Sequence, residues 1–298
     1  GTLVILTMVV LTGIRRSSGV NVAIVTVTLL SLAFFVVAGF PTALSHAERN
    51  LSSFLSSGPD GRYGLLQATA LMFVAYTGYG RIATLGEEVK QPHRTIPRAI
   101  IATLVASMLL YTSVAFVGVA AVGAEAYGQA TRLQVAPLEV IASGFGVPGA
   151  STVLTIGAMT AMLGVLLNLL LGLSRVLHAM GRSGDMPGHV ATVSERTGDP
   201  WVATLVVAGV IGGLVLLGDV SLTWSFSAFT VLIYYALTNL CALQLPPRQR
   251  LFPIWPAYCG LAACLFLAFW VDWRIWLTGI GLIIAGGLWQ EIANRLSR

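Results

Sequence analysis

The sequence predicts an all-α polytopic membrane protein, and three properties of its composition support this fold class. Of the 298 residues, 56% are hydrophobic and only 10% are charged. The mean hydropathy is +0.83. Soluble globular domains carry about 25% charged residues, so a soluble protein is excluded, and most of the surface is expected to contact the lipid bilayer.

Apolar segments long enough to cross a bilayer recur along the whole chain. A transmembrane helix needs about 20 mainly apolar residues, and the sequence offers eight such segments, at residues 20–41, 64–86, 98–122, 151–178, 201–217, 221–243, 254–271 and 274–290. The opening run, residues 1–13, is apolar but too short to cross, and it lacks the basic region and cleavage pattern of a secretory signal. We therefore expect eight full spans, preceded by the end of another span in a chain whose natural N-terminus is missing.

Lysine and arginine are distributed unevenly between the two predicted sides of the membrane. If residues 14–19 are cytoplasmic, twelve of the seventeen lie on the cytoplasmic side, Arg81 lies within a span, and four lie outside, namely Arg49, Arg62, Arg132 and Arg274. Short cytoplasmic loops concentrate basic residues. The C-terminus is therefore predicted to be cytoplasmic, in an integral, multi-pass protein of the plasma (inner) membrane.

The two longest connections, 42–63 and 123–150, are predicted to lie on the outer side. The second contains a proline-started apolar stretch, Pro137 to Ala142, which favours a short surface or re-entrant helix. The basic residues stand singly between hydrophobic spans, so the net charge of +5 does not indicate a nucleic-acid partner. The three cysteines lie in apolar runs without metal-ligand spacing, so neither a metal nor a cofactor is expected.

Segment 64–86 is the span that the sequence interrupts. Gly78 and Gly80 bracket Tyr79 and are followed at once by Arg81. A glycine in a helix interior costs about 1 kcal/mol, and a charge near mid-bilayer costs at least about 2.5 kcal/mol. The glycines could serve only close helix packing, with Arg81 reaching the inner surface. The functional interpretation is a broken helix whose free backbone groups line a polar site.

Residues 73–100, FVAYTGYGRIATLGEEVKQPHRTIPRAI, combine an aromatic run, a glycine break and a charged stretch with two prolines. This pattern resembles the sixth-helix signature of the amino acid/polyamine/organocation (APC) permease superfamily, and A-T-x-G-E-E-V is most similar to its cationic amino acid transporter branch. Residues 168–187, NLLLGLSRVLHAMGRSGDMP, resemble the end of the eighth helix in that superfamily. In this register the chain runs from the end of helix 4 through helix 12.

The resemblance implies a leucine-transporter-type fold, in which two inverted five-helix repeats each contain one helix unwound at mid-membrane. Residues 1–298 would then be a single, partial transmembrane permease domain, with the second repeat at 64–243 and two C-terminal helices at 254–290. It also implies secondary active transport of amino acids by alternating access, with a proton as the candidate coupling ion. A polyamine or organic cation carrier or exchanger is the alternative, and the oligomeric state is left open.

The resemblance places the substrate site at the glycine break. Seven consecutive residues would form it: Val74, Ala75, Tyr76, Thr77, Gly78, Tyr79 and Gly80. The carbonyl oxygens that bind the amino group of the substrate would be among the first four, and the last three would form the unwound turn. Tyr76 or Tyr79 would be an aromatic wall or gate.

Charge pairing is expected at the inner end of the same span. Glu87 and Glu88 either form a solvated charge cluster or act as a cytoplasmic gate, pairing with Arg81 or Arg175 in one state only.

Two positions depart from the pattern of the superfamily. Gly80 stands where many members carry an acidic residue, and Thr28 aligns with a lysine that is linked to proton coupling in some members. Coupling through that lysine is therefore unsupported in this chain.

An enzyme is not expected. Gly181-Arg182-Ser183-Gly184 matches the G-x-S-G pattern of rhomboid-type intramembrane proteases. Ser183, however, is expected in a charged cytoplasmic loop, and no later span carries a histidine that could activate it. A channel is the remaining alternative class, because a broken helix can also line a pore.

Overall fold

Helices account for nearly all of the chain that the computed structural model describes. The described residues are 1–11, 14–52, 61–78, 89–132, 136–194, 198–217 and 220–296. Within these ranges there is no β-strand, so the predicted all-α class is confirmed. The helices form two compact units, one from Gly1–Ser56 with Arg81–Gly213 and the other from Ser57–Gly80 with Leu214–Arg298.

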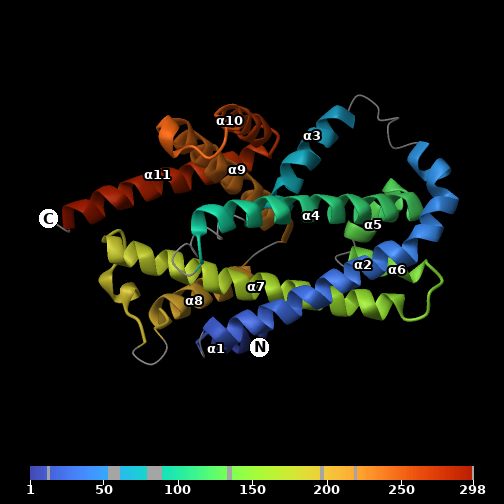
Figure 1. Cartoon of the computed structure of the whole chain (residues 1–298), viewed down its shortest axis with the longest axis horizontal. Helices are drawn as coiled ribbons and strands as arrows, with labels where there is room; N and C mark the ends of the chain where they lie inside the picture. Colours follow the sequence, from blue (N-terminus) through green and yellow to red (C-terminus); the bar gives the residue numbers. More distant parts are fainter. Residues whose placement is uncertain are drawn as a thin grey trace. The chain divides into compact units, whose positions relative to one another are not determined.

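The first unit is built around three long helices. Its elements are α1 (Thr2–Leu11), α2 (Ile14–Ser52), α4 (Pro92–Val122), α5 (Ala124–Arg132), α6 (Pro137–Ser143), α7 (Ala150–Ser183), a 3₁₀ turn at Gly188–Ala191 and most of α8 (Trp201–Leu217). Helix α2 packs along both α4 and α7 (Figure 1). Phe35, Val117 and Leu154 are almost fully buried between these three helices.

The second unit is centred on α9. Its elements are α3 (Gly61–Met72), the 3₁₀ helix η1 (Phe73–Tyr76), α9 (Val220–Gln244), a 3₁₀ turn at Pro247–Gln249, α10 (Trp255–Ala268) and α11 (Trp273–Leu296). Helix α9 contacts α3, η1, α10 and α11. Ala70, Phe229 and Leu232 form the centre of the buried cluster, which places the end of α3 against α9.

Four helices in the described part of the chain are long and apolar enough to cross a membrane, and they lie in α2, α4, α7 and α9. Helices α10 and α11 meet at an angle of 119° and make a fifth crossing if they form one broken span. Each of the eight predicted segments contains a helix, but α8 and the described part of 64–86 are shorter than a full span. The polytopic membrane class is thus confirmed, whereas the count of eight spans stays a prediction.

Two predicted connections are wrong in part, because helices extend into them. Helix α2 begins at Ile14 and continues past Pro41 to Ser52, so it covers all of 14–19 and half of 42–63. The stretch after Pro41 is rich in residues that favour a helix, such as alanine, leucine and glutamate. Within 123–150, the short helix predicted from Pro137 is confirmed as α6, and α5 is a further helix that the sequence analysis missed.

Candidate binding site at the end of α3

The backbone leaves the α-helical conformation shortly before the expected glycine break at Gly78 and Gly80. Helix α3 ends at Met72 and tightens into η1, which ends at Tyr76. Thr77 is extended, with φ −88° and ψ 171°. Gly78 has φ +106°, a conformation that residues with a side chain rarely adopt. The apolar helix therefore ends at Thr77 instead of continuing through the segment.

Thr77 stabilises this ending through its own hydroxyl group. The backbone N–H of Thr77 donates to the Val74 carbonyl over 3.1 Å, and its Oγ1 donates to the same oxygen over 2.7 Å. Threonine hydroxyls compete in this way with helical hydrogen bonding. Because a carbonyl oxygen has two lone pairs, the carbonyl of Val74 is fully used within the turn.

The next carbonyl group along the chain has a different environment. The carbonyl of Thr77 accepts no hydrogen bond from the part of the chain that the structure describes. No described atom lies within 4 Å of the position that a Cβ atom at Gly78 would occupy. A backbone carbonyl oxygen can accept a hydrogen bond from a positively charged donor of a small molecule.

The structure describes only some of the residues that the sequence assigned to the site. Val74, Ala75, Tyr76, Thr77 and Gly78 are contiguous in η1 and directly after it, and all five are half-buried.

The remaining residues of the turn and of the expected charge cluster, Tyr79, Gly80, Arg81, Glu87 and Glu88, lie outside the described residues. Arg175, their expected partner, is half-buried on α7. The gate therefore stays a prediction.

Two aromatic residues of α9 contact the end of α3, and the sequence analysis did not identify them. Trp224 Nε1 donates a hydrogen bond to the Leu71 carbonyl over 3.2 Å. Tyr235 packs edge-on against Phe73, with ring centroids 5.7 Å apart. The available signal was the tryptophan itself, since an indole N–H inside an apolar span needs an acceptor.

A line of polar contacts joins α2 to α7 in the first unit. Asn168 Nδ2 donates to Asn21 Oδ1 over 2.8 Å, and Thr28 Oγ1 lies 3.2 Å from Thr160 Oγ1. Thr28, the position that aligns with the coupling lysine of some superfamily members, is thus hydrogen-bonded across a helix interface.

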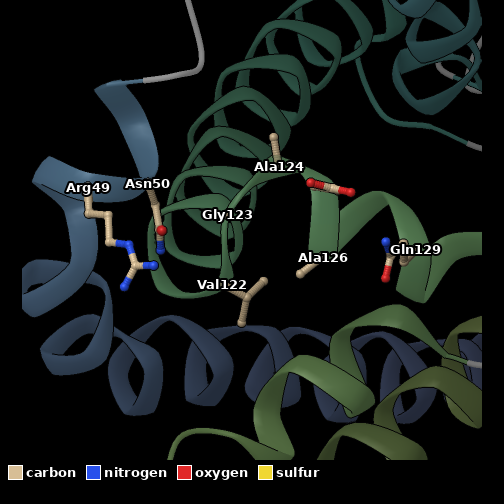
Figure 2. Close-up of a pocket in the computed structure, with 8 residues that line it drawn as sticks. Arg49, Asn50, Val122, Gly123, Ala124, Ala126 and Gln129 are labelled. Atoms are coloured by element: carbon tan, nitrogen blue, oxygen red, sulfur yellow. The ribbon is translucent and has the colours of Figure 1, made fainter.

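A cavity of about 600 Å³ lies where the ends of α2 and α4 meet the start of α5 (Figure 2). Arg49 and Asn50 line it from α2, and Glu125 and Gln129 line it from α5. Asn50 is fixed in place because its Nδ2 donates to the Ala120 carbonyl over 2.8 Å. The charged residues have opposite signs and are exposed, so the lining does not select a ligand of one charge.

The serine of the protease-like pattern lies in a helix and not in a loop. Ser183 is in the last turn of α7, and its hydroxyl donates to the Ala179 carbonyl over 3.1 Å. The loop expected at this residue begins only at Gly184, whose φ of +86° ends the helix. The hydroxyl thus has a local backbone partner and no base was found for it in the sequence.

Comparison with known proteins identifies the family. A sequence model of the amino acid permease family matches residues 1–295. An uncharacterized transporter of Mycobacterium tuberculosis is 40% identical over 272 residues, which cover 89% of this chain and 59% of the relative.

Two relatives with named substrates are each 30% identical to the chain. The branched-chain amino acid permease BcaP of Bacillus subtilis matches over 288 residues, which are 91% of this chain and 59% of the relative. The vacuolar cationic amino acid transporter 4 of Arabidopsis thaliana matches over 248 residues, 82% of this chain and 40% of the relative. The chain thus spans less than two thirds of the length of these relatives. With a family match over almost its whole length and an all-α polytopic fold, the chain belongs to the amino acid permease family of the APC superfamily.

Proposed function

We propose that this protein is a secondary active transporter that carries amino acids by alternating access and binds them at the end of α3. The observation that supports this proposal is the interruption at Thr77 and Gly78, where an apolar helix of an amino acid permease stops. Secondary transporters bind substrates at interrupted helices near the bilayer midplane, because the interruption frees backbone groups in an otherwise apolar region.

The proposed chemistry is recognition of a zwitterion by uncharged backbone. The amino group of the substrate is a hydrogen-bond donor with a positive charge, and the Thr77 carbonyl is our first candidate for its acceptor. The Val74 carbonyl accepts from Thr77 in the described conformation, and the carbonyls of Ala75 and Tyr76 are the further candidates that the resemblance to the superfamily gives. Carbonyl dipoles bind a cation without placing a second full charge in the membrane, which would be costly.

Branched-chain and cationic amino acids are the candidate substrates, because two relatives are named as transporters of these classes. A polyamine or organic cation is the competing substrate class. A proton is the candidate coupling ion, although the coupling lysine of some superfamily members is replaced here by Thr28. We propose transport and not catalysis as the activity.

The membrane arrangement is also part of the proposal. Residues 64–243 would form the second five-helix inverted repeat, and 254–290 the two C-terminal helices, within one permease domain. The C-terminus would lie in the cytoplasm, as the distribution of basic residues predicts, and the plasma (inner) membrane is the proposed location.

Reconstituted full-length protein tests the proposal. Uptake of labelled leucine or lysine into proteoliposomes should saturate with concentration and show counterflow, which a channel does not. An imposed pH gradient should drive uptake if a proton is coupled. Putrescine as a better competitor than either amino acid would instead favour the polyamine alternative.

A pair of glycine variants tests the location of the site. Gly78→Ala introduces a side chain at φ +106°, whereas Gly64→Ala adds a methyl group at a position in α3 with no described atom within 4 Å. A left-handed backbone costs a residue with a Cβ roughly 1–2 kcal/mol, so Gly78→Ala should raise the KM about five- to thirtyfold and Gly64→Ala should not. Equal KM values for the two variants would contradict a site at the break.

A further inference from the structure

The last turn of α3 contains carbonyl groups that a continuous helix would have satisfied. The last four carbonyl groups of an α-helix have no partner further along the helix, and the change to a 3₁₀ turn at Phe73 alters which N–H groups are in reach. Leu71 lies in this last turn, and its carbonyl accepts the indole N–H of Trp224 over 3.2 Å. A side chain of α9 thus satisfies the backbone where α3 ends.

A second contact fixes the same segment two residues later. The ring of Phe73, the first residue of η1, meets the ring of Tyr235 at an interplanar angle of 75°. Edge-to-face contacts of this kind are favourable and directional. Tyr235 is only 5% exposed and belongs to the buried cluster of the second unit, so it is a fixed support and cannot easily move away.

The two supporting residues lie on one face of α9. They are separated by about three helical turns, which returns both side chains to the same direction. The fully buried Ala70 brings the backbone of α3 close to this face. One face of α9 therefore holds the end of α3 on both sides of the change from α-helix to 3₁₀ helix.

We propose that Trp224 and Tyr235 are positioning residues, which hold the last turn of α3 and η1 in the conformation that presents the Thr77 carbonyl to the substrate. The part of this inference that concerns substrate binding rests on the proposed function. Neither side chain needs to contact the amino acid. They would act on the substrate site only through the backbone. Thr77 directly follows η1, so the position of its carbonyl depends on the conformation of η1.

The second unit contains a matched control for Trp224. Trp276 Nε1 on α11 donates to the Ala268 carbonyl at the end of α10 over 2.8 Å. The bond is of the same type, from an indole to a backbone carbonyl near a helix end, but it is remote in sequence from the break. Phenylalanine at either position keeps an aromatic ring and removes the donor. Trp224 is 47% exposed, so its replacement should leave the core packed.

The experiment compares full-length wild type, Trp224→Phe and Trp276→Phe in two measurements. Hydrogen–deuterium exchange followed by mass spectrometry reports the opening of the peptide that contains Leu71 to Thr77, and uptake into proteoliposomes gives KM and kcat. We expect faster exchange in that peptide and a KM raised about two- to tenfold only in Trp224→Phe, the range that loss of one hydrogen bond produces. The kcat should change less than twofold. Tyr235→Leu should accelerate exchange in the same peptide.

The two measurements separate failure of this inference from failure of the proposed function. Unchanged exchange at Leu71 to Thr77 in Trp224→Phe would overturn the positioning role, whatever the KM. Equal changes of KM in Trp224→Phe and Trp276→Phe would also overturn it, because the effect would then be a general loss of stability. Faster exchange with an unchanged KM would overturn the link between Trp224 and substrate binding, whereas failure of the proposed site itself would appear as equal KM values for Gly78→Ala and Gly64→Ala.

Discussion

The side-chain amide of Asn168 on α7 donates a hydrogen bond to Asn21 Oδ1 on α2 over 2.8 Å. The same Nδ2 also donates to the Gly164 carbonyl in its own helix over 2.8 Å. Lipid offers no hydrogen-bond partner to a polar side chain in a span, so such pairs join transmembrane helices. Asn21 and Asn168 therefore specify how α2 and α7 pair.

Removal of this hydrogen bond should weaken the packing of α2 on α7. Asn168→Ala and Asn21→Ala should each lower stability, and a double-mutant cycle should give a coupling energy of about 0.6 kcal/mol, with roughly 1.7 as the upper limit. The measurement is reversible unfolding in mild detergent. Thr26→Ala is the control, because within the described residues the Thr26 hydroxyl bonds only to the Val22 carbonyl of its own helix. A coupling energy of zero would mean that the two side chains do not interact in solution.

Gly157 should not tolerate a larger residue, because α2 passes directly over it. A Cβ atom at position 157 would lie 2.6 Å from Ser31 Oγ on α2. Gly157→Ala should therefore force the helices apart and destabilise the protein by about 1–3 kcal/mol, as overpacking does. Gly209→Ala on α8 is the matched control, since no described atom lies within 4 Å of its Cβ position. Thermal unfolding should place Gly157→Ala below Gly209→Ala, and the reverse order would contradict the interface.

Stability should fall in alkaline solution through Tyr127 on α5. Burial raises the pKa of the Tyr127 phenol above its ordinary value of about 10. Below pH 10 the phenol is neutral in both folded and unfolded protein and does not affect the balance. As the pH rises from about 10 toward the higher folded pKa, the unfolded state loses its proton first, so the folded state loses stability.

The measurement for Tyr127 is the unfolding midpoint between pH 9 and pH 11. Tyr127→Phe should show a shallower decline than wild type, because it removes the buried phenol. Identical slopes for wild type and Tyr127→Phe would show that the phenol does not contribute.

The effect of Arg81→Ala on substrate selectivity should show what Arg81 does, a prediction that rests on the sequence alone. Arg81 follows the glycine break in the sequence and would lie about 9 Å from Glu87 in a helix, at about 1.5 Å per residue. If Arg81 binds the carboxylate of the substrate, Arg81→Ala should weaken transport of leucine and glutamate and spare or improve that of lysine. If Arg81 pairs with a gate carboxylate, the substitution should slow all three substrates alike. Competition assays distinguish these results, and unchanged transport of all three would assign Arg81 to the inner surface.

Helix ends show where sequence patterns stop being informative. The span predicted at 20–41 was found, but α2 extends from Ile14 to Ser52, because hydropathy detects the part of a helix that lies in lipid and not the part beyond it. At 254–271 and 274–290 hydropathy identified two apolar helices but not the angle between them. That bend, 119°, depends on how each helix packs against α9. Sequence alone cannot distinguish two spans from one broken span at this place.

The sequence by itself determined the all-α membrane class and the approximate position of most long helices, and it predicted an interruption at Gly78 and Gly80. These features depend on local properties, namely the length of apolar runs and the low helix propensity of glycine. Only the tertiary structure decided which residues support the break. Trp224 and Leu71 are far apart in the chain, and they meet because α3 and α9 bury a shared apolar cluster around Ala70 and Leu232. Such a pairing depends on the packing of two helices, and one sequence contains no local signal for it.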